Sequence, residues 1–191
     1  MTVVDGRSLR RMRNKDAAAD AILDLLLEGA GAPTAQQVAE RSGVSLRSIF
    51  RLFEDVEGLH AAAIQRQAGR IGALLTDVPT DGPLDSRITA FVDGRARVWE
   101  AIAPVRRHAI RLAATSPVIA GELARTRRFF RKQLRVLFAA EVADDDELLD
   151  AVEAAASWES WDLLRNGHGL SRPGAVRVVT RTLRALLDKE S

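Results

Sequence analysis

The 191-residue sequence contains no cysteine and no tyrosine, and only three of its residues are lysines. The lack of cysteine excludes disulfides, thiol catalysis and thiolate metal sites. No apolar run approaches the roughly 18 residues that span a bilayer, and the basic start MTVVDGRSLRRMRNKD lacks the apolar segment of a signal peptide. We therefore expect a cytoplasmic globular protein that has no membrane partner and can bury its own core.

Charges of the two signs are nearly balanced, with 28 Lys and Arg against 26 Asp and Glu. The isoelectric point of about 9.6 is high because, without tyrosine or cysteine, almost no group titrates between about pH 7 and 11. The position of the basic residues is more informative, since five of them lie between Arg7 and Lys15 with no acidic residue among them. We expect residues 1–13 to form a basic N-terminal arm.

Helical patterns fill the chain, whereas the alternating patterns of β-strands are scarce. Apolar residues recur at helical spacing from Ala18 to Leu26, and Gly29 and Pro33 end that first helix. We expect an all-α fold of about nine helices without internal repeats. After the first three, the expected helices cover about 56–75, 84–103, 105–115, 118–141, 145–166 and 173–189.

Residues 34–53, TAQQVAERSGVSLRSIFRLF, have the punctuation of a helix-turn-helix. Thr34 and Gln37 match a capping box at the start of a short helix. Gly43 permits a turn that other residues disfavour, and Ser45 suits the N-cap of a second helix. This arrangement is the one that places a second helix against a DNA duplex.

The second helix of this motif has two contrasting faces. Its apolar residues are expected to face inward: Leu46, Ile49, Phe50 and Phe53. The opposite face then carries Arg47, Ser48 and Arg51, whose side chains suit guanine edges and phosphates. An ordinary helical hairpin with a solvated basic face is the alternative interpretation.

At these residues the sequence resembles the DNA-binding domain of TetR-type transcriptional regulators. The resemblance covers residues 14–64 and includes TAQQVAERSGVS, SIFRLF and EDVEGLHAAAI, and the ending SWESWDLLRNGHGLSRPGAVRVVTRTLRALL resembles the last two helices of many members. It implies an all-helical homodimer, with a DNA-binding domain at 14–60 that binds a palindromic operator. The remainder, 61–191, would dimerise and bind a small-molecule effector that releases a repressor from DNA. The residues expected to contact DNA are Thr34, Gln36, Ser45, Leu46, Arg47, Ser48, Phe50 and Arg51, with Arg10, Arg11 and Arg13 of the arm.

Three residues depart from the usual TetR pattern. Phe50 stands where a tyrosine is common, Leu52 replaces a polar residue, and Val56 replaces a lysine, so phosphate contacts are lost. The arm would offset this loss by entering the minor groove or lying along the phosphates, unless it is only a solvated tail. These departures leave open an alternative function, a helical ligand-binding or protein-interaction module with a degenerate DNA-binding region. A nucleoid-type architectural protein is a third possibility.

The C-terminal half suggests a partner and a pocket. The helix expected at 145–166 is apolar around most of its circumference, which favours burial against a second copy. The expected dimer interface consists of Val152, Ala155, Ala156, Val176, Val179, Leu183 and Leu186. An effector pocket is expected near Phe91, Trp99, His108, Phe129, Phe130, Trp158 and Trp161, although each of these also suits a core.

Signs of catalysis are missing from the sequence. The three histidines lack the spacing of metal ligands, and there is no glycine-rich phosphate loop and no nucleophile elbow. We expect no enzyme activity, no cofactor and no metal.

Overall fold

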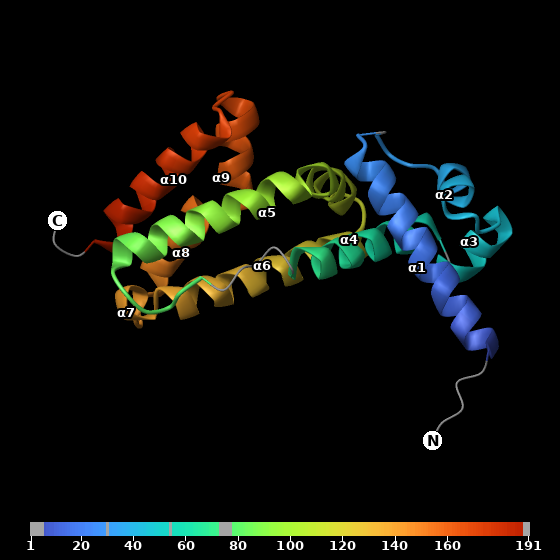
Figure 1. Ribbon diagram of the computed structural model, residues 1–191, viewed down its shortest axis with the longest axis horizontal. Helices are drawn as coiled ribbons and strands as arrows, with labels where there is room; N and C mark the ends of the chain where they lie inside the picture. Colours follow the sequence, from blue (N-terminus) through green and yellow to red (C-terminus); the bar gives the residue numbers. More distant parts are fainter. Residues whose placement is uncertain (1–5, 30, 54, 73–77, 189–191) are drawn as a thin grey trace, which may run out of the picture. The chain divides into compact units, whose positions relative to one another are not determined.

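The computed structural model describes residues 6–29, 31–53, 55–72 and 78–188, which form helices and connecting turns without a strand (Figure 1). The helices in chain order are α1 Gly6–Leu27, α2 Ala35–Ser42, α3 Leu46–Phe53, α4 Val56–Gly72, α5 Leu84–Ala113, α6 Pro117–Leu137, α7 Ala139–Val142, α8 Asp146–Ala155, α9 Trp158–Asp162, the π-helical turn η1 Leu163–Gly167, and α10 Arg172–Leu187. The predicted all-α class is confirmed. Within the described ranges, no helix is long and apolar enough to cross a membrane.

The chain divides into two compact units. Unit 1 comprises residues 1–70 and 102–126, and unit 2 comprises residues 71–101 and 127–191. The segment expected to bind DNA, residues 14–60, lies within unit 1. Helices α5 and α6 each contribute one part to unit 1 and the other part to unit 2.

The core of unit 1 joins α1, α2, α3 and the start of α4. Ile22 of α1, Val38 of α2, Ile49 of α3 and Leu59 of α4 are buried in one apolar cluster. Gly43 ends α2 in the left-handed conformation, with φ 68°, and so lets the chain turn into α3. The orientation of α3 is therefore fixed by buried side chains on one side and by a glycine turn at its start.

The sequence predicts a helix break at Pro104, but α5 runs through this residue without ending, so that prediction is wrong. A proline inside a helix removes one backbone hydrogen bond and typically costs about 3 kcal/mol. Ile102 and Val105 are both buried next to Pro104. Burial of these neighbours offsets the cost and keeps the helix continuous.

The helix expected over 145–166 is instead divided into α8, α9 and η1. Ser157 is extended, with φ −70° and ψ 161°, and its hydroxyl accepts a hydrogen bond from the amide of Ser160 to cap α9. The hydroxyls of Ser157 and Ser160 also donate to the carbonyl of Ala154, at 2.8 and 2.6 Å, which satisfies the end of α8. The break lets Val152 and Trp158 both be buried in unit 2. Part of the apolar circumference that favoured a second copy is thus covered within the chain, whereas Leu163 remains 54% exposed.

Other helix boundaries differ less from expectation. The helix expected at 118–141 corresponds to α6 and α7, and the one at 173–189 corresponds to α10, which Ser171 caps by accepting from the amide of Gly174. Residues 73–75 and 189 of the expected helices, and residues 1–5 of the expected arm, lie outside the described residues.

Unit 2 has a core of its own, in which α5 is attached to α6 and α7. Phe138 is fully buried and meets the ring of Phe91 edge-on, with the centroids 5.8 Å apart. Nη1 of Arg87 donates to the carbonyl of Leu137 at 2.8 Å, and the guanidinium pairs with Glu141 of α7. This ion pair is almost wholly buried, and the Glu141 carboxylate raises the pKa of Arg87.

Two glycine substitutions test the role of the α2–α3 turn. Gly43→Ala forces a side chain into the left-handed conformation, so we expect a loss of about 1 kcal/mol in the free energy of unfolding. Gly69→Ala lies inside α4, where an added Cβ meets nothing within 4 Å, and should stabilise the protein by about 0.5–1 kcal/mol. Urea unfolding monitored by circular dichroism measures both changes. Equal effects of the two substitutions would contradict the assigned turn.

Candidate nucleic-acid interface

Hydrogen bonds at their N-termini position both helices of the helix-turn-helix. The amide of Gln37 donates to Oγ1 of Thr34 at 3.2 Å, and the amide of Thr34 donates to Oε1 of Gln37 at 2.9 Å. The predicted capping box is therefore confirmed. At α3 the amide of Ser48 donates to Oγ of Ser45 at 3.3 Å. These local bonds explain why the sequence alone located both helix starts.

The orientation of α3 differs from the prediction at two positions, Phe50 and Leu52. Ile49 and Phe53 are buried as expected, but Phe50 is 47% exposed, so its predicted inward orientation is wrong. Leu52 takes the inward place instead and is 8% exposed. On a helix, Phe50 lies about 100° from Ile49, whereas Leu52 and Phe53 lie three and four residues from it and share its face.

Phe50 therefore lies on the outward face together with Arg47 and Arg51, all three of which are exposed. The other residues expected at the interface surround this face. Thr34, Gln36 and Ser45 are exposed, while Leu46 and Ser48 are half-buried. Leu46 packs against the core of unit 1 and is in part a structural residue.

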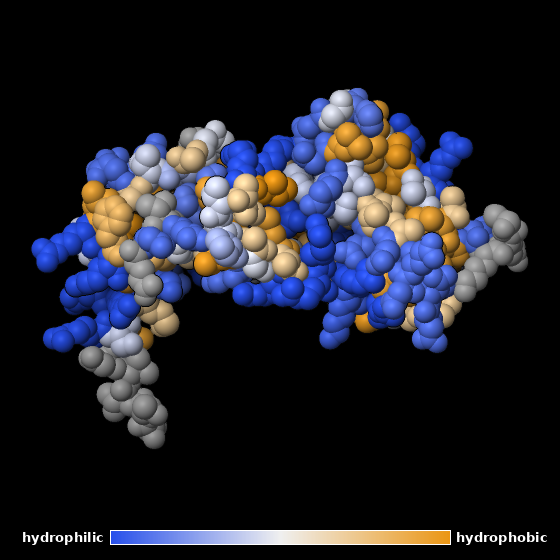
Figure 2. Space-filling model, turned by 180° about the vertical axis from the view of Figure 1, so that it is seen from behind, coloured by the Kyte–Doolittle hydropathy of each residue, from blue (hydrophilic) through white to orange (hydrophobic). Residues whose placement is uncertain are grey.

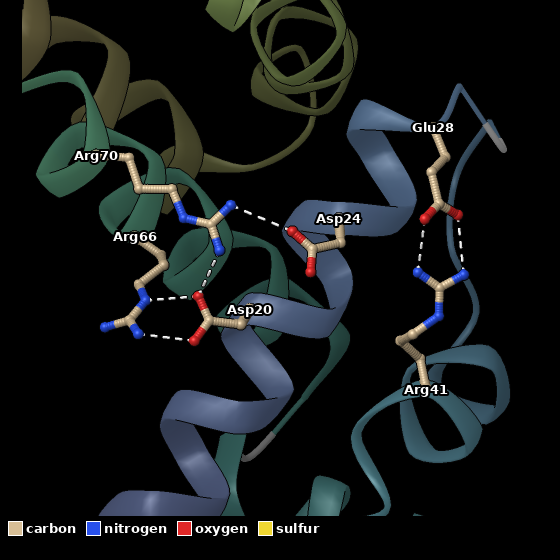
Figure 3. A network of polar contacts seen from close by, with 6 residues as sticks. All are labelled: Asp20, Asp24, Glu28, Arg41, Arg66 and Arg70. Carbon is tan, nitrogen blue, oxygen red and sulfur yellow. Dashed lines mark hydrogen bonds and ion pairs between the residues drawn. The ribbon is translucent and has the colours of Figure 1, made fainter. Parts of the chain in front are cut away.

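Several arginines of unit 1 are held by carboxylates and have a structural role (Figure 3). Arg66 binds Asp20 through two hydrogen bonds of 2.7 Å, and Arg70 joins the same carboxylate at 2.8 Å. Arg41 binds Glu28 through two bonds of 2.8 Å. The hydrogen bond from Arg66, followed by that from Arg70, lowers the pKa of Asp20 although partial burial opposes this. These pairs tie α1 to α2 and to α4.

The arginines predicted to contact DNA have no such partners. In the part of the chain that the structure describes, Arg47 and Arg51 of α3 make no hydrogen bond or ion pair, and the same holds for Arg10, Arg11 and Arg13 of α1. Unit 1 thus separates its arginines into a paired set and an unpaired, exposed set. The second set, to which the exposed Arg111 of α5 also belongs, is available to an external anion.

The basic N-terminal segment is helical from Gly6 onward, rather than an arm that precedes the first helix. Residues 6–15, here called the basic extension, prolong α1 by roughly 15 Å. Nζ of Lys15 lies 5.8 Å from the centroid of the Phe53 ring, so the C-terminal end of the basic extension lies beside the end of α3. Hydrophilic side chains cover this part of the surface (Figure 2).

A buried histidine pair joins α4 to the C-terminal part of α5 within unit 1. Nε2 of His108 and Nδ1 of His60 are 3.0 Å apart, and both rings are buried. Burial, with a smaller contribution from the charge of His108, lowers the pKa of His60 to about 4. Burial and then the charge of Arg111 lower the pKa of His108. Both rings are therefore neutral near pH 7, and one ring donates the shared proton to the other.

This pair places His108 away from the aromatic residues with which it was expected to form a pocket. Five of the other residues, Phe91, Trp99, Phe130, Trp158 and Trp161, are buried in unit 2, and Phe129 is exposed. The ring of Trp99 meets Phe130 at 5.0 Å and Trp158 at 6.0 Å, both edge-on.

The guanidinium of Arg95, a residue not predicted from the sequence, lies among these rings. A signal was present, because Arg87, Phe91, Arg95 and Trp99 are spaced four residues apart and so share one face of α5. A cation in the middle of an aromatic stripe predicts either a buried ion pair or a ligand contact.

The residues expected at a dimer interface are mostly covered by their own chain. Val152, Ala156, Val179 and Leu183 are buried, whereas Ala155, Val176 and Leu186 are half-buried. The α10 face that remains outward carries Val178, Thr182 and Ala185. In the described residues no cluster of three metal-binding side chains is present.

Comparison with known proteins identifies the fold. No protein-family model matches the sequence, and no curated protein sequence matches it. The structure is similar to the crystal structure of a transcriptional regulator from Rhodococcus sp. Rha1, with a TM-score of 0.71 and 18% sequence identity over 91% of this chain and 95% of that chain. The chain therefore has the all-helical fold of that regulator.

The histidine pair gives unit 1 a defined pH dependence. The unfolded chain protonates His60 near pH 6.5, whereas the folded chain resists protonation until about pH 4. The stability that depends on neutral His60 is complete above about pH 6.5 and declines as the pH falls toward 4, by up to about 3 kcal/mol. Urea unfolding across this range should show a smaller pH dependence for His60→Gln than for the unchanged protein. If the free energy of unfolding depended on pH equally in both proteins, the assigned role of His60 would be wrong.

Proposed function

We propose that the protein is a DNA-binding transcriptional regulator of the TetR type, with α3 as its recognition helix. The observation that carries this proposal is the separation of arginines in unit 1. Arg41, Arg66 and Arg70 are bound by carboxylates, whereas Arg47 and Arg51 are exposed and unpaired within the described residues. An exposed cation that no internal carboxylate neutralises is available to phosphates and to guanine edges.

The local structure of α3 suits base recognition. Phe50 lies beside the two arginines on the exposed face, and its ring can contact a thymine methyl group. Leu52 belongs to the core, so its lack of a polar group removes no DNA contact. Of the three departures that favoured a degenerate DNA-binding region, only that of Phe50 concerns an exposed side chain that the structure describes. The side chain of Val56 lies outside the described residues.

The basic extension supplies contacts that do not depend on sequence. Its arginines Arg10, Arg11 and Arg13 are exposed, and no acidic residue precedes Asp16 within it. Each phosphate that such a residue neutralises releases a counterion and steepens the salt dependence of binding. A helical extension loses less conformational entropy on binding than a flexible arm would.

A homodimer would present two copies of α3 to a palindromic operator. The surface that supports this proposal is the outward stripe of α10, made by Val178, Thr182 and Ala185 at spacings of four and three residues. The Thr182 hydroxyl donates to the carbonyl of Val178 at 3.0 Å, so its hydrogen-bonding need is met and its methyl group is free to pack. Hydrophobic residues reach the surface over α9 and α10 (Figure 2).

A small-molecule effector bound by unit 2 would complete the proposed regulator, which we take to be a repressor. The aromatic residues around Trp99 provide the apolar surface that such a pocket needs. Effector binding regulates DNA affinity only if the ligand binds one conformation of the dimer better than the other.

Substitution of Arg47 tests the recognition helix. We expect Arg47→Ala to weaken binding by about 1–3 kcal/mol and to relax base preference at defined positions. The DNA is a duplex that the full chain selects from a random library, and fluorescence anisotropy at several salt concentrations gives the affinity. Arg41→Ala is the matched control, because Arg41 is committed to Glu28 and its loss should leave base preference unchanged. Failure to select any duplex, or equal effects of both variants, would contradict the proposal.

A pair of valine substitutions tests the dimer surface. Val178 on α10 is 40% exposed and Val136 on α6 is 56% exposed, so neither valine is needed for the core of unit 2. We expect Val178→Asp to convert a dimer to a monomer, because it places two charges in an apolar interface. Val136→Asp should remain dimeric. Analytical ultracentrifugation distinguishes these results, and a monomeric unchanged protein would refute the proposed assembly.

A further inference from the structure

Arg95 of α5 is a buried cation surrounded by aromatic rings. Its side chain lies in unit 2 and the residue is only 6% exposed. The guanidinium carbon lies 4.1 Å from the ring centroid of Phe130, 4.8 Å from that of Phe91 and 5.3 Å from that of Trp99. Aromatic faces attract the charge, but each contributes only about 0.5–2 kcal/mol.

No carboxylate of the described chain neutralises Arg95. Its hydrogen bond goes from Nη2 to the neutral amide oxygen Oε1 of Gln133, at 2.9 Å. Burial without a compensating negative charge lowers the pKa of Arg95 to about 9. Removing a full charge from water in this way is costly unless a partner of opposite charge is present.

Other arginines of unit 2 are paired with carboxylates of the same chain. Arg87 pairs with Glu141, Arg131 pairs with Glu153, and Arg165 pairs with Glu100. Arg87 is about as buried as Arg95, yet it has both a carboxylate and a backbone carbonyl as partners. Arg95 is therefore a buried guanidinium that has aromatic and amide neighbours but no carboxylate partner in the described residues.

A cavity adjoins Arg95 and is lined largely by apolar groups. The residues that line it include Trp99, Trp161, and Ala156 and Ser157 at the break between α8 and α9. The free space is about 10 Å³, which is enough for one water molecule. An organic ligand can enter only when these side chains or this break move apart, so binding and conformational change are coupled.

We propose that this cavity binds a small organic carboxylate, whose negative charge pairs with Arg95 and whose apolar body lies against Trp99 and Trp161. The proposal rests on the proposed function, because it names the chemical class of the effector. A carboxylic acid and the amide of the same shape allow the charge interaction and the apolar contacts to be tested separately. An amide retains the apolar contacts and loses only the charge, and a site built around an unneutralised guanidinium rejects it.

Tryptophan fluorescence measures binding directly, because all three tryptophans of the chain, Trp99, Trp158 and Trp161, are buried in unit 2. The probes are benzoate, phenylacetate and cyclohexanecarboxylate, each compared with its amide on the full-length protein without DNA. We expect at least one acid to bind on the order of ten-fold or more tightly than its amide, as charge-assisted hydrogen bonds predict. Equal binding of acid and amide in every pair, or no binding of any acid, would overturn the proposal.

Variants of Arg95 establish which residue recognises the charge. Arg95→Met should abolish the preference for the acid and raise the thermal unfolding temperature, since an apolar side chain of similar length suits this environment. Arg95→Lys should retain part of the preference, and it keeps the test valid if Arg95→Met does not fold. Arg97→Met, an exposed residue of the same helix, is the control and should bind as the unchanged protein does. Full acid preference in Arg95→Met would overturn the proposal.

The ligand test and the DNA test fail in distinguishable ways. Acid-selective binding that depends on Arg95, without selection of any DNA, would refute the regulator and leave a carboxylate-binding protein. DNA selection without acid-selective binding would leave the regulator and refute this inference. When both succeed, the preferred acid should weaken DNA binding by the unchanged protein and by Arg97→Met, but not by Arg95→Met.

Discussion

Burial of one face of α3 determines the arrangement of the proposed DNA-binding surface. Ile49, Leu52 and Phe53 are covered by the core of unit 1, and a helix with three buried residues on one face has no rotational freedom about its axis. Arg47, Phe50 and Arg51 are consequently exposed together. An inward Phe50 would have required a rotation of α3 by nearly a third of a turn, which would expose Leu52 and move Arg51 toward the domain.

Electrostatics within unit 1 depends on where the acidic residues lie as much as on where the arginines lie. Three carboxylates, those of Asp20 and Asp24 in α1 and of Glu28 just after it, follow one another at intervals of about one helical turn and bind arginines of α2 and α4. The basic extension contains none. The same helix therefore has a neutralised half that packs against the unit and a cationic half that remains unneutralised. Surface ion pairs of this kind contribute little stability individually. Their main effect here is on charge, because they neutralise Arg41, Arg66 and Arg70, so that the unneutralised positive charge lies at α3 and the basic extension.

The sequence predicted those features that local interactions decide. The capping box at Thr34, the glycine turn at Gly43 and the all-α class need only neighbouring residues, and all three are present. Features decided by packing were not predictable in this way. The continuity of α5 depends on burial around Pro104, and the break at Ser157 depends on two hydroxyls that both donate to one carbonyl. The spacing of Phe91, Arg95 and Trp99 indicates a shared face of α5, but packing decides that Phe130, 35 positions away, meets Arg95 there.

Helix α5 gives the proposed effector a physical route to the rest of the chain. Arg95 occupies its first part, whereas Val105 joins the core around α1 to α3 and His108 binds His60 of α4. A ligand that neutralises Arg95 removes an electrostatic cost borne by α5, so the conformation in which that cost is greatest gains the most from binding. Regulation follows when that conformation is also the one that holds α3 unfavourably for DNA, since a ligand shifts an equilibrium only by its difference in affinity for the two states. A buried, unneutralised charge is suited to this purpose because its energy changes strongly with small movements of the groups around it.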